Sequence, residues 1–343
     1  NFSNVKGVGR ILVGGLRELS VRVYISPTKL AANNLTVQEV EPSTSKGRDI
    51  LDTVGNTPMV EISRMSPKKE VHIFAKLEGQ NPTGSLKDRI AKRMVEKAES
   101  DGRLTAEKTI LEPTSGNTGI SLAFLARRKG YKIKVVMPEN VSQERTQLLE
   151  AYGAEIVYTD GSKGTNGAIV VAQEMAAADD NFLMLYQYGN ESNPLAHYET
   201  TGKEIIQDCP DIDYFVAGLG TGGTLMGVGR RLKEYNPDIK VVAVVPHPDD
   251  VIQGLRSLEE GFIPPILDLS LLDSRIMVES KEAFRSVREL MQAEGIFAGV
   301  SSGSVVHCAQ RLALRIEKGN IVCLLADGGW KYLSTSMWTK EFT

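Results

Sequence analysis

The chain has 343 residues, enough for about two domains, and 41% of them are hydrophobic, which is ample for a buried core. Its 40 basic and 43 acidic residues give a net charge of −3, so the composition indicates no general attraction to nucleic acid. No apolar run approaches the roughly 20 residues of a membrane span. The three cysteines are too few for a disulfide framework or a zinc site, and the four histidines show no metal-ligand spacing.

Residues 1–45 are predicted to form an N-terminal arm or extension. Asn1–Asn34 is basic and nearly free of acidic residues, as an organellar transit peptide would be. Leu19–Ile25 alternates as a strand does, so we favour an arm that packs on a partner subunit. A disordered tail is the alternative.

The turn Asn81–Arg89 lies between a predicted strand, Val71–Leu77, and a predicted amphipathic helix, Ile90–Glu99. Lys87 therefore falls near a helix start. The positive end of a helix and burial both lower the pKa of an ammonium group. A lysine in such a place can act as an amine nucleophile or form a Schiff base. The alternative interpretation is a solvated lysine in the first turn of a helix.

Two further turns are rich in glycine and hydroxyl side chains. Glu112–Ser121 follows the apolar segment Thr109–Leu111, and its backbone N–H groups at a helix start suit a carboxylate or another anion. Gly218–Thr224 follows the apolar strand Tyr214–Ala217, and its four glycines and two threonines suit a phosphate. Neither turn is a Walker motif. Tight packing of a helix against a strand explains a glycine-rich turn about as often as phosphate binding does. Together with Lys87, they suggest an amino acid bound beside a phosphorylated aldehyde.

The rest of the chain alternates short apolar strands with helices, which is the pattern of parallel α/β layers. The predicted strands are Lys134–Met137, Glu155–Tyr158, Phe182–Tyr186, Val241–Val245 and Ile321–Leu325. The predicted helices are Ser142–Tyr152, Gly167–Ala178, Glu282–Ala293 and Val305–Glu317. Cys308 and Cys323 lie in apolar contexts and are predicted to be core residues.

The loops Asn81–Arg89, Pro113–Gly119 and Gly220–Thr224 resemble the signature loops of the fold type II pyridoxal-phosphate enzymes, and specifically those of cysteine synthases. The likeness runs from about Asp49 to about Thr335. Four segments are closest to the B-type branch that uses O-phosphoserine: Met137–Asn140, Tyr186–Asn190, Glu294–Gly299 and Asp327–Thr335.

This resemblance implies two three-layer α/β domains with mostly parallel sheets and pyridoxal 5'-phosphate in the cleft between them. Residues 80–187 would form the smaller, mobile domain. Residues 46–79 and 188–335 would form the larger domain, which binds the cofactor phosphate, and residues 336–343 would be a C-terminal tail.

The resemblance also implies a role for each matched residue. Lys87 would be the catalytic residue and would form a Schiff base with the cofactor, and Asn117 would hydrogen-bond the cofactor's phenolic oxygen. Ser301 would face the pyridine nitrogen, and Arg256 would bind the phosphate of O-phosphoserine. The cofactor phosphate would be held by Gly220, Thr221, Gly222, Gly223 and Thr224. The substrate carboxylate would be held by Thr114, Ser115, Gly116, Thr118 and Gln187. No residue is expected to bind a metal.

Two of these assignments have structural alternatives. Ser301 could be an ordinary N-cap before the helical segment Val305–His307. Arg256 could instead form a surface salt bridge to Glu259 or Glu260.

The expected activity is that of a cysteine synthase, in which a sulfur nucleophile replaces the β-substituent of an activated serine to give L-cysteine. O-phosphoserine is the favoured substrate and O-acetylserine a second. Cystathionine β-synthase is the nearest alternative enzyme, a serine or threonine dehydratase is a weaker one, and a non-catalytic homologue that binds a partner's tail is the alternative from another class. By resemblance we expect a cytoplasmic homodimer acting on small molecules, with a thiocarboxylated sulfur-carrier protein as a candidate sulfur donor.

Overall fold

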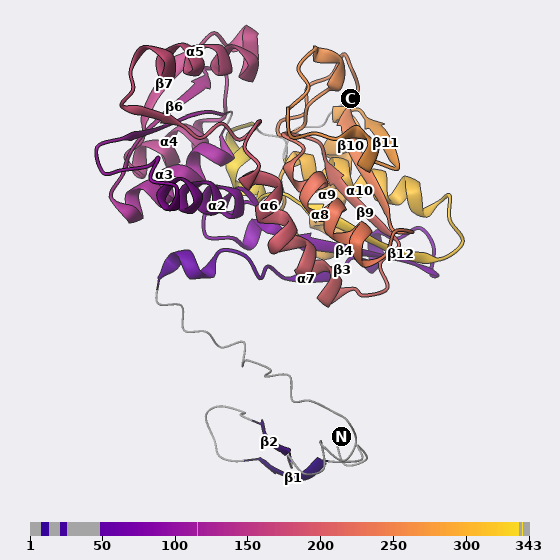
Figure 1. Cartoon of the computed structure of the whole chain (residues 1–343). Helices are drawn as coiled ribbons and strands as arrows, with labels where there is room; N and C mark the ends of the chain where they lie inside the picture. The colour runs from indigo at the N-terminus through magenta and orange to yellow at the C-terminus, as the bar shows by residue number, and fades with distance from the viewer. Residues whose placement is uncertain (1–7, 14–20, 26–48, 115, 336–337, 339–343) are drawn as a thin grey trace. The chain divides into compact units, whose positions relative to one another are not determined.

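The computed structural model describes residues 8–13, 21–25, 49–114, 116–335 and 338, in two units, residues 1–47 and 48–343 (Figure 1). In the first unit, β1 (Val8–Val13) pairs antiparallel with β2 (Val21–Ile25). The predicted strand at Leu19–Ile25 is therefore confirmed from Val21 onward. The rest of the predicted arm, and the predicted tail apart from Trp338, lie outside the described residues, and packing on a partner subunit stays a prediction.

The larger sheet of the second unit has six strands in the order β11-β10-β9-β12-β4-β3. All neighbours in it are parallel except β3, which is antiparallel to β4. Its strands are β3 (Met59–Glu61), β4 (Val71–Leu77), β9 (Tyr214–Gly218), β10 (Lys240–Pro246), β11 (Ser274–Val278) and β12 (Gly319–Leu325). Helices cover both faces, so β10 is buried from residue 241 to residue 246 and reads as a continuous apolar run.

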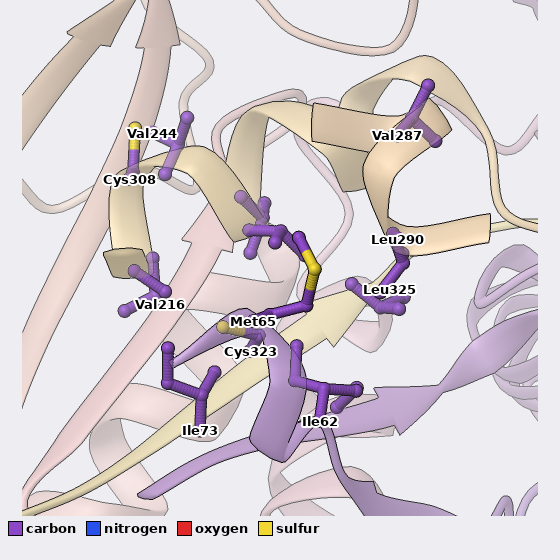
Figure 2. Close-up of a cluster of buried hydrophobic side chains, with 14 of the residues drawn as sticks. Ile62, Met65, Ile73, Val216, Val244, Val287, Leu290, Cys308, Cys323 and Leu325 are labelled. Carbon is purple, nitrogen blue, oxygen red and sulfur yellow. The ribbon is translucent and has the colours of Figure 1, made fainter. Parts of the chain in front are cut away.

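Successive residues of these strands point to opposite faces of the sheet. On one face, Val216 and Cys323 pack with α9 (Ser280–Glu294) and α10 (Val300–Ala313), and Figure 2 shows this cluster around Met65. The opposite face packs against α7 (Thr201–Asp208) and α8 (Gly223–Tyr235) through residues such as Phe215, Ala217 and Val322. Cys308 lies in the first cluster beside Cys323, so the prediction that both cysteines belong to the core is confirmed.

The smaller sheet has four parallel strands in the order β7-β6-β5-β8. They are β5 (Thr109–Pro113), β6 (Lys132–Pro138), β7 (Glu155–Thr159) and β8 (Phe182–Met184). One face, with Ile110 and Val135, packs on α2 (Lys87–Ser100), α3 (Asn117–Lys129) and α4 (Gln143–Ala151). The other, with Leu111 and Val136, packs on α5 (Gly164–Ala178). The helix α6 (Ser192–Glu199) then leads back to the larger sheet.

The two sheets and their helices form two three-layer α/β arrangements, which confirms the predicted fold class. The division into domains at residues 80 and 187 stays a prediction. None of the helices in the described part of the chain is both long enough and apolar enough to cross a membrane.

Several predicted boundaries were wrong. The helix predicted at Val305–Glu317 begins five residues earlier, at Val300, and ends at Ala313, because the chain must turn into β12 at Gly319. The strand predicted at Phe182–Tyr186 ends at Met184, because Tyr186 has a φ of +56°, which a strand cannot contain.

A buried ion cluster fixes the start of α2. The guanidinium of Arg89 donates to both carboxylate oxygens of Glu78, at 2.7 and 2.8 Å, and to both of Glu204, at 2.6 and 2.8 Å. Burial raises the pKa of Glu204, but the bonds and charge of Arg89 outweigh it and lower that pKa to about 2. Because Arg89 lies two residues after Lys87, this cluster ties the lysine end of α2 to η3 (Glu78–Gln80) and α7.

The substitution Arg89→Met should lower the free energy of unfolding by about 3 kcal/mol or more, because it leaves the buried Glu78 without its cation and Glu204 with Lys76 as its remaining cation. Urea unfolding of the apoprotein followed by circular dichroism measures it. The matched control is Arg128→Met, which removes the exposed partner of Asp49 and should cost less than about 1 kcal/mol. Equal losses in the two variants would contradict the anchoring role of Arg89.

Candidate active site

Lys87 is the first residue of α2 and lines a cavity. The sequence placed it near a helix start, but the predicted helix began three residues too late, at Ile90. Burial lowers the pKa of its ammonium group to about 8, although the nearby carboxylates of Glu112 and Asp327 act in the opposite direction. A pKa of about 8 leaves an appreciable fraction of the side chain as free amine near neutral pH. The site therefore contains a nucleophile that is available without a separate base.

The glycine-rich loop forms the opposite wall of this cavity. β9 ends at Gly218, and Gly222 caps α8 with a φ of +89°, a conformation that favours glycine. Thr221 Oγ1 accepts a hydrogen bond from Asn193 Nδ2 at 3.0 Å. A side chain at Gly223 would collide with Asn193 Oδ1. The loop is thus a glycine-rich cradle at the start of a 13-residue helix, where backbone N–H groups bind anions.

The same cavity contains the other residues predicted to contact a cofactor. Its lining includes Lys87, Asn117, Gly220, Thr221, Gly222, Thr224, Gly254, Leu255, Ser301, Val305 and Tyr332. Gly223 is buried behind the loop and is not part of the lining. Sequence motifs more than 200 residues apart therefore meet at one cavity.

Ser301 lies in the first turn of α10, and the N-cap of this helix is Gly299. The alternative assignment of Ser301 as an N-cap is therefore wrong. Gly254, with a φ of +91°, passes close to it, and a Cβ there would stand 3.6 Å from Ser301 Oγ. The hydroxyl thus reaches the cavity past a residue with no side chain.

A second cavity shares Lys87, Asn117, Gly220, Thr221, Gly254 and Leu255 with the first. Its further lining includes Thr114, Thr118, Arg145, Thr165, Gln187, Tyr188 and Arg256. Thr118 Oγ1 donates to Gln187 Oε1 at 2.7 Å, so these two predicted carboxylate-binding residues hold each other in place.

Gly116 does not line either cavity. Its N–H donates to Thr114 Oγ1 at 3.1 Å, and its φ of +150° suits glycine alone. Its position therefore fits a backbone role in shaping the turn before α3. Ser115 lies outside the described residues.

Arg256 is buried, with only 8% of its surface exposed. Its Nη1 donates to Asn166 Oδ1 at 2.9 Å, and its guanidinium lies over the rings of Tyr188 and Phe262, 5.3 and 4.9 Å from their centroids. Arg256 is therefore not a surface residue, and an ion pair with Glu259 or Glu260 stays an alternative. Stacking against two rings holds the guanidinium at the wall of the second cavity.

Sequence reasoning missed a carboxylate beside Lys87. Glu112 is fully buried and accepts the backbone N–H groups of Tyr186 and Gln187, at 2.8 and 3.0 Å. Burial raises the pKa of Glu112 to about 7, although those two bonds and Lys87 act to lower it. It shapes the positive-φ turn at Tyr186 that presents Gln187 to the cavity. Its position between an apolar strand and the Pro113 turn was the only signal in the sequence.

Sequence reasoning also missed the polar groups that the C-terminal segment brings to the site. Asp327 Oδ2 accepts from Asn117 Nδ2 at 2.7 Å and from Tyr332 Oη at 2.6 Å. Lys331 Nζ donates to Asn117 Oδ1 at 2.7 Å. Of the two aromatic residues that flank Lys331 in the sequence, Trp330 and Tyr332, the second lines the first cavity.

Comparisons with known proteins agree with this geometry. A family described as "Pyridoxal-phosphate dependent enzyme" matches residues 50–327. The cysteine synthase of Staphylococcus aureus strain Mu50 is 43% identical over 301 residues, covering 85% of this chain and 97% of that protein.

Solved structures are similar as well. O-ureido-L-serine synthase is 38% identical with a TM-score of 0.81, over 86% of this chain and 97% of its own. Cysteine synthase from Entamoeba histolytica is 34% identical with a TM-score of 0.81, over 90% and 95%. A hydrogen sulfide-producing enzyme from Fusobacterium nucleatum is 39% identical with a TM-score of 0.79, over 83% and 99%.

The matched family covers most of the chain, and the relatives are similar over nearly their whole lengths. The chain therefore belongs to the pyridoxal-phosphate-dependent enzymes, in the family of the cysteine synthases.

Proposed function

We propose that this enzyme makes L-cysteine by β-replacement on an activated serine, with O-phosphoserine as the favoured substrate. One observation carries the proposal: the amine of Lys87, the cradle at residues 220–224 and the hydroxyl of Ser301 line a single cavity. The cysteine synthase of Staphylococcus aureus supports the reaction class. Homodimer formation, a cytoplasmic location and a thiocarboxylated sulfur carrier stay predictions.

The residues present fit pyridoxal phosphate. The cradle offers helix N–H groups and the hydroxyls of Thr221 and Thr224 to a phosphate. A Cβ at Gly220 would come within 3.0 Å of Gly254 O, so side-chain-free backbone forms both walls at this point. Ser301 can hydrogen-bond the ring nitrogen, and Lys87 can bond the aldehyde carbon. When bound, pyridoxal phosphate supplies an electron sink conjugated to Cα of the amino acid.

Lys87 has two proposed tasks in the reaction. Its amine holds the cofactor between turnovers, and once displaced by the substrate it removes the Cα proton at Nζ and later returns it. Burial favours both, because it lowers the pKa of the ammonium group to about 8. A fully protonated surface lysine could do neither near neutral pH.

Ser301 directs the outcome. Its hydroxyl donates a hydrogen bond without adding charge, whereas an aspartate at this place would keep the ring nitrogen protonated. With the neutral serine, the pyridine ring is a weaker electron sink than it would be with the aspartate. A weaker sink favours loss of a β-substituent over transamination.

The second cavity is proposed to hold the substrate. Thr114, Thr118 and Gln187, with the start of α3, would bind the substrate carboxylate. Arg256 would bind the phosphate of O-phosphoserine, because a guanidinium pairs with a phosphate dianion through two charge-assisted bonds. An acetyl ester offers no such partner.

Separate spectral titrations of the purified enzyme with O-phosphoserine and O-acetylserine test the first substrate. The proposal expects O-phosphoserine to change the visible absorption at a lower concentration and to release phosphate. Sulfide, homocysteine or a thiocarboxylated carrier added next identifies the second substrate. A response to O-acetylserine alone would contradict the O-phosphoserine preference.

Replacing Arg256 with alanine should reduce kcat/KM for O-phosphoserine by about 30-fold or more, the effect of losing charge-assisted bonds of about 2 kcal/mol. Turnover of O-acetylserine, measured on the same preparation, is the internal control and should change about threefold or less, within ordinary mutational scatter. Equal losses with both esters would count against the phosphate-binding role.

Trace labelling of the apoprotein with an acylating reagent should show that Lys87 titrates early. Labelling of Lys87 should reach half its plateau near pH 8, because burial disfavours the ammonium form. Exposed Lys281 is the control in the same chain, since Glu279 raises its pKa above 10.5. Peptide mass mapping reads both residues. A common midpoint for the two lysines would refute the lowered pKa.

A further inference from the structure

We propose that Lys331 is a positioning residue that fixes the side-chain amide of Asn117, so that its N–H donors point toward the reacting end of the Lys87 cavity. The inference rests on the proposed function, in which Asn117 hydrogen-bonds the phenolic oxygen of the cofactor. It gives a role in the site to Lys331, a residue that lines neither cavity.

The hydrogen bonds determine which way the amide points. Lys331 Nζ lies 2.7 Å from one terminal atom of Asn117, and an ammonium group can only donate. That atom must therefore be the carbonyl Oδ1. The NH₂ group then lies on the other side, where it donates to Asp327 Oδ2 at 2.7 Å. The ammonium of Lys331 on one side and the accepting carboxylate of Asp327 on the other therefore select the same orientation of the amide.

Asn117 needs an external support of this kind. It is the first residue of α3, and its N-cap Gly116, at a φ of +150°, makes no side-chain cap bond. The support comes from η7 (Gly329–Thr335) and from Asp327, two residues before it, 210 to 215 positions further along the chain. Tyr332 completes the arrangement by donating to the same oxygen of Asp327, so that carboxylate is held as well.

Burial of Lys331 carries a desolvation free energy that a solvent-exposed lysine would not have. Its side chain is fully buried, and burial lowers the pKa of its ammonium group to about 8, against the opposing charges of Asp327 and Asp88; Arg145 lowers it further. The charged groups that face it are therefore two carboxylates and one guanidinium. Because buried ions of this kind rarely stabilise a fold better than a hydrophobic side chain of similar volume, orientation of Asn117 is the better explanation for the lysine.

Loss of Lys331 leaves Asp327 as the remaining one of the two groups that orient the amide, so the N–H donors of Asn117 should be held less firmly toward the proposed phenolic oxygen. Lys331→Met keeps the length and removes the donor. We expect its apoprotein to bind pyridoxal phosphate about tenfold more weakly or worse, as for the loss of a bond to a charged group. The visible absorption of the bound cofactor should shift with it.

A double-mutant cycle separates positioning from mere stability. Lys331→Met, Asn117→Ala and the double variant are titrated with pyridoxal phosphate by absorbance, with circular dichroism as the check on folding. If Lys331 acts through Asn117, the double variant binds no more weakly than Asn117→Ala. Lys331→Gln, which donates a neutral bond from a similar volume, should lie between wild type and Lys331→Met. This variant carries the test if Lys331→Met does not fold.

Lys76→Met is the matched control. Lys76 is another buried lysine. Its Nζ lies 2.7 Å from Thr57 O, 3.0 Å from Glu204 Oε2 and 3.1 Å from Asp208 Oδ2, and none of these partners lines either cavity. The affinity of this variant for pyridoxal phosphate should stay within about twofold of wild type, because Glu204 keeps both bonds from Arg89 and no bond to a residue of either cavity is lost.

Additive losses from Lys331→Met and Asn117→Ala, a loss in Lys76→Met equal to that in Lys331→Met, or unchanged binding by Lys331→Met and Lys331→Gln would each overturn the inference. Wild-type affinity in Asn117→Ala would instead contradict the role proposed for Asn117. The two failures are therefore distinguishable.

Discussion

The burial of an amine at the first residue of α2 is the constraint on which the rest of this site depends. Burial lowers the pKa of Lys87 to about 8 against the opposing charges of Glu112 and Asp327. Arg89, two residues later, is held by the carboxylates of Glu78 and Glu204, and this prevents the helix start from moving out toward solvent. The ion cluster of Arg89 with Glu78 and Glu204 therefore helps to keep the nearby amine of Lys87 buried.

The two sheets bring the remaining groups to that amine by a common rule. In parallel α/β sheets, ligands bind beyond the carboxyl ends of the strands. β5 ends just before Thr114, β9 two residues before the cradle at residues 220–224, and β12 two residues before Asp327. Each loop then enters a helix or a helical turn, so N–H groups and short side chains meet at one cavity. The chemistry follows from strand order and loop composition more than from any one residue.

The parts of this site that the sequence predicted are those that depend on local chemistry. Glycines and hydroxyl residues at a strand-to-helix turn restrict the backbone within a few residues, so the cradle at 220–224 and Lys87 could be located before the structure. Lys331 and Glu112 could not, because their partners lie 214 and about 75 positions away and nothing local marks them as buried. The start of α10 was missed for a related reason: Ser301 suits a cap, but burial of the whole first turn extends the helix to Val300.

The bond between the ε-nitrogen of Lys87 and the cofactor aldehyde is the central claim of this account. The direct measurement is reduction of the purified holoenzyme with borohydride, followed by proteolysis and peptide mass mapping. The account predicts a pyridoxyl-phosphate adduct on the peptide that contains Lys87. An unmodified Lys87, or an adduct at another lysine, would contradict it.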